Sequence, residues 1–155
     1  MALDSTAREA NLRDSLKKFF VDSLEIIEKL NLTFDKGLSV PKIQGTSIDK
    51  WVSINFKEIE TDTVARHAID IVCCSRKDTE GFILAQLRDK VMGYLEDKDQ
   101  FDSIRRIPLY RSSATETWTK VGGIMVYPGI ESMQMESEDG TKFKIINVDL
   151  RWAIK

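Results

Sequence analysis

Apolar residues between positions 7 and 30 recur at steps of three and four. The stripe comprises Leu12, Leu16, Phe19, Phe20, Ile27 and Leu30. This spacing predicts an amphipathic surface helix that buries one face. Ser5 or Thr6 is placed to cap its start, with Glu9 three residues after Thr6, and Asn31 is a plausible stop.

Two stretches of period-2 alternation follow the helix. Residues 51–56 alternate apolar and polar side chains, whereas residues 64–74 become apolar on both faces toward their end. The short polar linker 58–62 predicts an antiparallel hairpin of two strands. The segment 35–50 that precedes them has no sustained period, so we expect a long loop with a short strand around residues 38–43.

A second helix is predicted to run to about Leu95, with Asp78 or Thr79 as its N-cap. Its expected buried stripe is Ile83, Leu84, Leu87, Val91 and Leu95.

The last third of the chain has strand patterns at residues 103–110, 115–120 and 143–154. Gly122-Gly123 is expected to interrupt the strand pattern. Asp139-Gly140 predicts a hairpin with a type I′ turn. The apolar positions change phase within the final strand, which we interpret as a β-bulge near Ile145 and Ile146.

The order of these elements predicts an α+β fold. We expect one domain over residues 1–155, with an antiparallel or mixed sheet of about five to six strands and two main helices packed on one face. The length of 155 residues suits one domain that needs no disulfide or metal for stability.

Bulk composition narrows the function classes. The net charge of −2 argues against non-specific binding to nucleic acid, which normally requires a basic surface. Neither a secretory signal nor an apolar run of the roughly 20 residues that span a bilayer is visible. Cys73 and Cys74 are neighbours that would point to opposite faces of a strand, so a reduced, cytoplasmic setting is expected.

Candidate chemistry is sparse. The chain has one histidine, His67, in the middle of a predicted strand, which favours a structural role over that of a catalytic base. Asp-Ser-Leu, the tripeptide around the modified serine of acyl carrier proteins, occurs at Ser15 and Ser23, but helical periodicity explains both copies. Asp70 and Asp149 are candidate ligands for a metal-dependent nuclease, without a compact carboxylate and lysine set beside them. We therefore predict no enzyme activity, no cofactor and no metal.

The order helix, loop, strand pair, helix and strands resembles phage tail terminator proteins of the tail-completion and neck family. The strand pair lies at Trp51–Phe56 and Val64–Cys74, the second helix at Thr79–Leu95, and the last strand is Lys144-Ile145-Ile146-Asn147-Val148-Asp149-Leu150-Arg151-Trp152. The likeness is one of layout and covers most of the chain, without a signature motif.

This resemblance implies a homohexameric ring that caps the tail tube, ends its polymerisation and provides the surface for head joining. The implied partners are the tail tube protein and a head-completion or connector protein, with DNA passing through the lumen and no membrane involved. The implied location is the virion, and the host cytoplasm during assembly. Another neck protein, such as a head–tail connector or stopper, and a small metal-dependent nuclease remain the alternatives.

Ring contacts require surfaces that differ on the two sides of a subunit. We expect them in the loop 35–50, in the basic cluster around Tyr110 and at tryptophans, which are enriched at interfaces. The arginines are also expected to form salt bridges with acidic neighbours. The predicted contact residues are Lys36, Val40, Lys42, Trp51, Arg105, Arg106, Arg111, Trp118 and Trp152.

Overall fold

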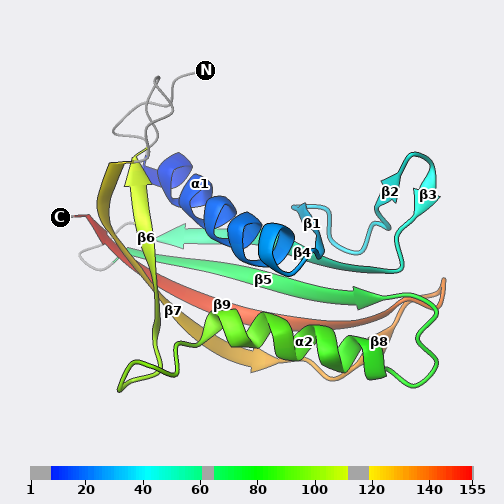
Figure 1. The fold of residues 1–155 in the computed structure, drawn as a ribbon. Helices are drawn as coiled ribbons and strands as arrows, with labels where there is room; N and C mark the ends of the chain where they lie inside the picture. Colours follow the sequence, from blue (N-terminus) through cyan, green and yellow to red (C-terminus); the bar gives the residue numbers. More distant parts are fainter. Residues whose placement is uncertain (1–7, 61–64, 112–118, 155) are drawn as a thin grey trace.

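The computed structural model describes residues 8–60, 65–111 and 119–154. Its centre is a seven-stranded sheet in the order β1-β4-β5-β9-β7-β6, with β8 paired beside β9 (Figure 1). The strands of this sheet are β1 (Asn31–Phe34), β4 (Lys50–Glu60), β5 (Ala65–Ser75), β6 (Arg105–Arg111), β7 (Thr119–Glu131), β8 (Met135–Glu136) and β9 (Lys142–Ile154). Because β1 runs parallel to β4 and the other pairs are antiparallel, the sheet is mixed.

Both helical segments pack on one face of this sheet. They are α1 (Arg8–Phe20), which continues into the π-helix η1 (Val21–Ile27), and α2 (Phe82–Leu95). Their apolar stripes share one buried cluster with side chains from β4, β5, β6, β7 and β9. The predicted α+β fold is therefore confirmed, and two short strands, β1 and β8, extend the sheet beyond the predicted number.

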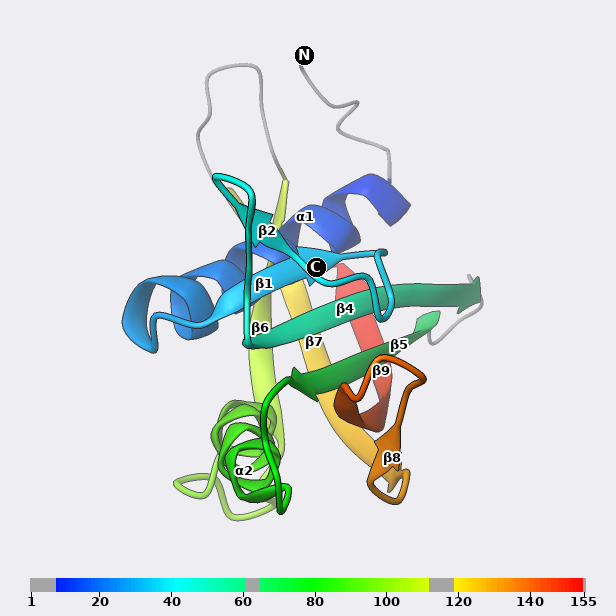
Figure 2. The ribbon, with the colours of Figure 1, turned by 90° about the vertical axis from the view of Figure 1, so that its right-hand side faces the viewer.

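The sheet curls around the first helical segment. Helix α1 packs on β6, at one end of the strand order, while η1 packs on β1 at the other end. Figure 2 shows the strands curling between these two ends. Tyr94 of α2 donates a hydrogen bond of 2.7 Å to Glu28, just after η1, which ties the two helical segments together. This hydrogen bond, with Lys90 beside it, lowers the pKa of Glu28.

The change from α-helix to π-helix alters which side chains face the core. A π-turn contains more residues than an α-turn, so the three- and four-residue stripe does not continue through η1. Leu24 is buried, whereas Ile27, which the stripe predicts to be buried, is 66% exposed. The helix ends before Lys29, whose φ is +59°, and strand β1 begins two residues later, where the sequence predicts only a helix stop.

The other face of the sheet carries a second, smaller apolar cluster. Its buried members are Trp51, Val72 and Cys74. Partly buried Val40, Ile48, Phe143 and Ile145 cover it. Cys73 belongs to the main core and Cys74 to this outer cluster, which confirms that the two thiols point to opposite faces.

This outer cluster explains the change of phase in the last strand. The register between β5 and β9 is continuous from Trp152 to Lys142, so the predicted bulge near Ile145 is wrong. Phe143 and Ile145 are apolar because they cover Trp51, whereas Ile146 begins the set that faces the helices. The irregularity lies instead in β7, between Pro128 and Glu131.

Two local predictions about glycines also need correction. Gly122 and Gly123 lie inside β7 and pair with both β6 and β9, so they do not break the strand. Gly140 has a φ of +84° while Asp139 keeps a negative φ. A type I′ turn needs positive φ at both central positions, so this hairpin has another turn type, in which the Asp139 carboxylate accepts a hydrogen bond from Thr141 N at 3.1 Å.

Candidate interaction surface

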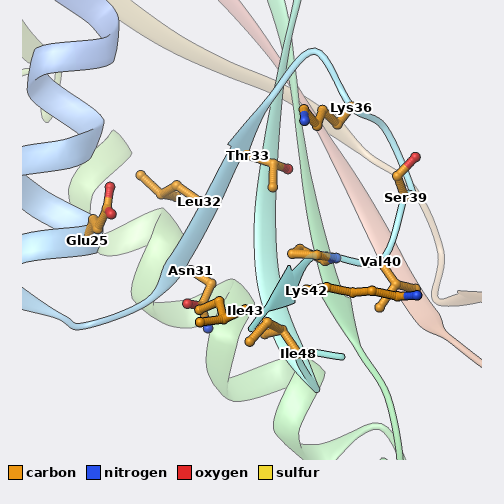
Figure 3. A pocket seen from close by; sticks show the side chains of 11 residues that line it. Glu25, Asn31, Leu32, Thr33, Lys36, Ser39, Val40, Lys42, Ile43 and Ile48 are labelled. Carbon is orange, nitrogen blue, oxygen red and sulfur yellow. The ribbon is translucent and has the colours of Figure 1, made fainter. Parts of the chain in front are cut away.

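The free edge of β1 lies beside a groove of about 520 Å³. The strand pairs with β4 along one edge, and no other described strand pairs with its outer edge. We call this hollow the β1-edge groove. Its lining is Glu25, Asn31, Leu32, Thr33, Lys36, Ser39, Val40, Pro41, Lys42, Ile43 and Ile48 (Figure 3).

The groove combines apolar walls with unbalanced charge. Leu32, Ile43 and Ile48 line it from β1, from β2 (Lys42–Ile43) and from the residue after β3 (Thr46–Ser47). Lys36 and Lys42 carry positive charge and form no ion pair with any residue of the described segments, and Glu25 is the acidic side chain in the lining. An apolar hollow with positive charge suits an apolar side chain flanked by carboxylates.

The loop that builds the far wall of the groove is anchored at several points. Asp35 forms an ion pair with Arg13 of α1 and accepts a hydrogen bond of 2.9 Å from Phe56 N of β4. Gly37 N donates to Asn55 Oδ1 at 3.1 Å, and Ile48 N donates to the carbonyl of Pro41 at 2.9 Å. The first part of this loop is therefore anchored to β4 through Asp35 and Gly37, and its later part is closed by its own hydrogen bond.

The opposite edge of the sheet is protected. Tyr110 N of β6 donates to Ser15 Oγ of α1 at 2.8 Å, and Ser15 in turn donates to the carbonyl of Asn11 at 2.8 Å. Pro108 has no N–H to offer to another strand, as is common at sheet edges. The two ends of the sheet thus differ, because one is covered by a helix and the other is open beside a groove.

A second prominent surface is the loop 96–104 between α2 and β6. Phe101 at its tip is 98% exposed. The loop is fixed by backbone hydrogen bonds of 3.1 Å from Asp97 to Ser103, from Gln100 to Asp97 and from Ser103 to Gln100. We call it the Phe101 loop.

Arg105 and Arg106 hold the base of the Phe101 loop. Arg105 donates to the carbonyl oxygens of Tyr94 and Glu96, at 3.0 and 3.1 Å, and lies 3.7 Å from an Asp97 carboxylate oxygen. Arg106 forms a forked pair with Asp102 at 2.8 and 3.3 Å, which lowers the pKa of that carboxyl group. The predicted salt bridges to acidic neighbours are confirmed for both arginines, and they lie within one subunit.

The other predicted contact residues divide into three groups. Lys36, Val40 and Lys42 meet at the β1-edge groove. Trp51 and Trp152 are 0% and 4% exposed, so both are core residues, and their assignment as contact anchors is wrong for this subunit. Arg111 ends β6, but its side chain, like all of Trp118, lies outside the described residues.

Sequence reasoning missed several residues of these two surfaces. Leu32 and Ile43 lie in four- and two-residue strands, too short for a recognisable alternation. The exposure of Phe101 could have been predicted, because it is the aromatic residue within a polar, mostly charged segment from Glu96 to Asp102.

The remaining chemical candidates are buried or ion-paired in the part of the chain that the structure describes. His67 is buried next to the Phe56 ring at 5.9 Å between centroids, and Ser15 is buried against β6. Asp70 lies 3.4 Å from the Lys57 ammonium group. Within the described ranges, no cluster of three or more histidine, cysteine or acidic side chains could hold a metal ion. None of the described helices is long and apolar enough to cross a membrane.

Comparison with known proteins gives the fold but no family. No family model and no curated protein matches the sequence. Among solved structures, a chain whose name describes no function aligns with 95% of this chain and 96% of its own length, with a TM-score of 0.59 and 9% sequence identity. At this identity the likeness concerns the architecture, which spans nearly the whole of both chains.

Proposed function

We propose that this protein is a virion assembly protein of the phage tail terminator kind. It acts as a non-enzymatic subunit of a homohexameric ring that caps the tail tube, ends its polymerisation and presents the surface for head joining. Its partners are further copies of itself, the tail tube protein and a head-completion or connector protein.

The observation that carries this proposal is the difference between the two ends of the sheet. A closed ring is built from heterologous contacts, in which one surface of a subunit meets a different surface of the next. The open β1 edge with its groove is one such surface, and among the described residues the β6 edge differs from it, because α1 packs there and Tyr110 N is bonded to Ser15. An edge strand beside apolar walls is a common site for association between chains.

The order of elements supports the same proposal. The helix, loop, strand pair, second helix and final strands of the sequence resemblance correspond to α1, the loop 35–50, β4–β5, α2 and β6–β9. The chemical candidates also agree with a structural role, since His67 and Ser15 are buried.

The test is the mass and shape of the assembly. Light scattering coupled to gel filtration, over a wide range of concentrations, is expected to show a particle of six times the 17.7 kDa subunit mass. Electron microscopy is expected to show rings, alone or at the ends of purified tail tubes. A monomer that neither self-associates nor binds tubes would refute the proposal.

Two further measurements separate the proposal from its alternatives. Binding to the end of a tail tube, with tubes stopped at a fixed length, distinguishes a terminator from a connector or stopper, which binds the head side. Incubation with DNA and Mg²⁺ is expected to leave the DNA intact, whereas cleavage that disappears in an Asp70→Asn variant would favour the nuclease.

A further inference from the structure

We infer that the Phe101 loop of one copy occupies the β1-edge groove of the next copy. This inference rests on the proposed ring, and it names the two surfaces that meet within it. The occupant is a second copy of this chain, and its leading residue is Phe101.

The Phe101 loop exposes an aromatic side chain on a backbone that is held by hydrogen bonds. Phe101 is 98% exposed, more than any other large apolar side chain of the described segments. An aromatic ring in water is an unfavourable arrangement that burial against a partner would relieve. The hydrogen bonds within the loop, and Arg105 and Arg106 at its base, fix the loop backbone before contact, so little ordering of the backbone is needed on binding.

The β1-edge groove and the Phe101 loop are complementary in shape and polarity. The groove of about 520 Å³ is concave and is walled by Leu32, Val40 and Ile43, whereas the loop is a projection with one ring at its tip. A phenylalanine side chain fits into this volume with room for its neighbours.

The Phe101 loop and the β1-edge groove carry opposite net charge. Asp97 and Asp102 are paired with Arg105 and Arg106, but exposed Asp99, two residues before Phe101, has no ion-pair partner in the described segments. The groove carries Lys36 and Lys42, which also have no ion-pair partner there. The loop residues without an ion pair in the described segments are Glu96, Lys98 and Asp99, whose charges sum to −1, and those of the groove are Glu25, Lys36 and Lys42, whose charges sum to +1. Docking Phe101 would therefore bring opposite net charges together.

The two surfaces lie at opposite ends of the subunit. The groove lies at the β1–β2–β3 end of the molecule, and the Phe101 loop lies at the far end, beyond the last turn of α2 (Figures 1 and 2). One subunit cannot bring them together, so the contact must join two copies. Repeated head to tail, it produces a closed ring or an open filament.

The first experiment is disulfide trapping in the full chain. Ser39 lines the groove and Gln100 precedes Phe101, so a Ser39→Cys, Gln100→Cys double variant is expected to give a ladder of covalent oligomers on oxidation. The two single variants are the controls, and neither should form a covalent dimer efficiently. The native thiols of Cys73 and Cys74 are buried, with pKa values raised to about 12, and should not interfere.

The second experiment measures assembly by light scattering. Phe101→Ser is expected to weaken self-association at least about tenfold, as expected for a hot-spot aromatic. Met133→Ser is the matched control, because Met133 is 77% exposed but lies outside both surfaces. Asp99→Lys and Lys42→Glu should each weaken assembly, and the double variant should recover most of it.

The outcomes separate this inference from the ring itself. Rings that form without disulfide ladders, and that tolerate Phe101→Ser as well as Met133→Ser, overturn the Phe101 contact and leave the proposed function standing. A covalent dimer that forms efficiently from either single-cysteine variant would show a two-fold contact and would also overturn it. A chain that remains monomeric, with and without tail tubes, overturns both.

Discussion

Asp78 is expected to contribute more to stability than its position before a helix suggests. It is a buried residue that accepts hydrogen bonds from Leu84 N at 2.9 Å, Ile83 N at 3.4 Å and Ser75 Oγ at 3.0 Å. Asp78→Ala removes the carboxylate that accepts hydrogen bonds from Ile83 N and Leu84 N in the first turn of α2, and the loss of such a helix-capping acceptor costs about 1 kcal/mol. It also leaves the buried hydroxyl of Ser75 without its acceptor, which costs about 1–3 kcal/mol more.

The expected loss for Asp78→Ala is therefore about 2–4 kcal/mol in the free energy of unfolding. A chain of this length loses about 2–4 °C of melting temperature per kcal/mol, so the melting temperature should fall by roughly 4–16 °C. Urea unfolding followed by circular dichroism measures the loss directly. The slope of the unfolding free energy against urea concentration should be the same for the variant and the wild type.

Matched variants test the reasoning behind this magnitude. Ser75→Ala should cost less than Asp78→Ala, and the double variant should cost less than the sum of the two, by about 1 kcal/mol, because no hydroxyl is then left without a partner. A loss below about 0.5 kcal/mol for Asp78→Ala, or full additivity of the two changes, would refute the argument.

The same site predicts a dependence on pH. Burial by itself raises the pKa of Asp78, but hydrogen bonds from the Leu84 backbone, the Ser75 hydroxyl and the Ile83 backbone outweigh it and lower the pKa. The stabilisation is therefore fully present above the pKa of the unfolded chain, about 4, and is lost as the pH falls through the lowered folded pKa. The stability difference between wild type and Asp78→Asn should shrink over that acidic range, and a difference that stays constant would contradict this assignment.

Three further changes have defined outcomes. Gly81→Ala should destabilise the protein by about 1–2 kcal/mol, because Gly81 has a φ of +77°, which strains any residue with a Cβ. The Gln134 side chain also lies where the new Cβ would be. Adding Gln134→Ala should therefore restore only part of the loss, because it removes the contact but leaves the backbone strain. Cys73 and Cys74, with pKa values raised to about 12 by burial, should react with a thiol reagent at pH 8 only as the protein unfolds, and rapid labelling of the native protein would contradict their burial. Ser15→Ala should cost about 1–3 kcal/mol in urea unfolding because it leaves a backbone N–H of β6 without its acceptor, and an unchanged midpoint would show that water replaces the hydroxyl.

Long patterns in the sequence predicted the long elements of the fold. The alternation of residues 51–56 and 64–74 corresponds to β4 and β5. Four members of the predicted stripe of α2 are buried, Leu84, Leu87, Val91 and Leu95, whereas the fifth, Ile83, is 38% exposed. The predicted N-cap at Asp78 or Thr79 is wrong in position, because the N-cap of α2 is Gly81, although the Asp78 carboxylate accepts hydrogen bonds from Ile83 N and Leu84 N in the first turn. The predictions of the long elements succeeded because a single buried face imposes a regular period over ten or more residues.

The errors occurred where two environments meet within one element. Ile27 is exposed because the helix widens into a π-helix, which sequence periodicity does not reveal. The phase change at Ile145 and Ile146 was interpreted as a bulge, although both faces of β9 are apolar there for different reasons. Trp51 belongs to the outer cluster, which exists because the loop 35–50 folds back over the sheet, and that fold-back is a tertiary event.

The shape of the β1 edge favours a ring over a two-fold dimer. In a two-fold contact through β1, the groove of each copy would face the groove of its partner, and two concave surfaces leave a void between them that has no packing partner. Such a dimer would also place Lys36 and Lys42 of both copies in one region, with Glu25 as the acidic residue of each lining. Docking of the convex Phe101 loop into the groove avoids both costs. Each pair of copies joined in this way still has one free groove at one end and one free Phe101 loop at the other. If the proposed contact forms, assembly continues from copy to copy until the ring closes, as the proposed function requires.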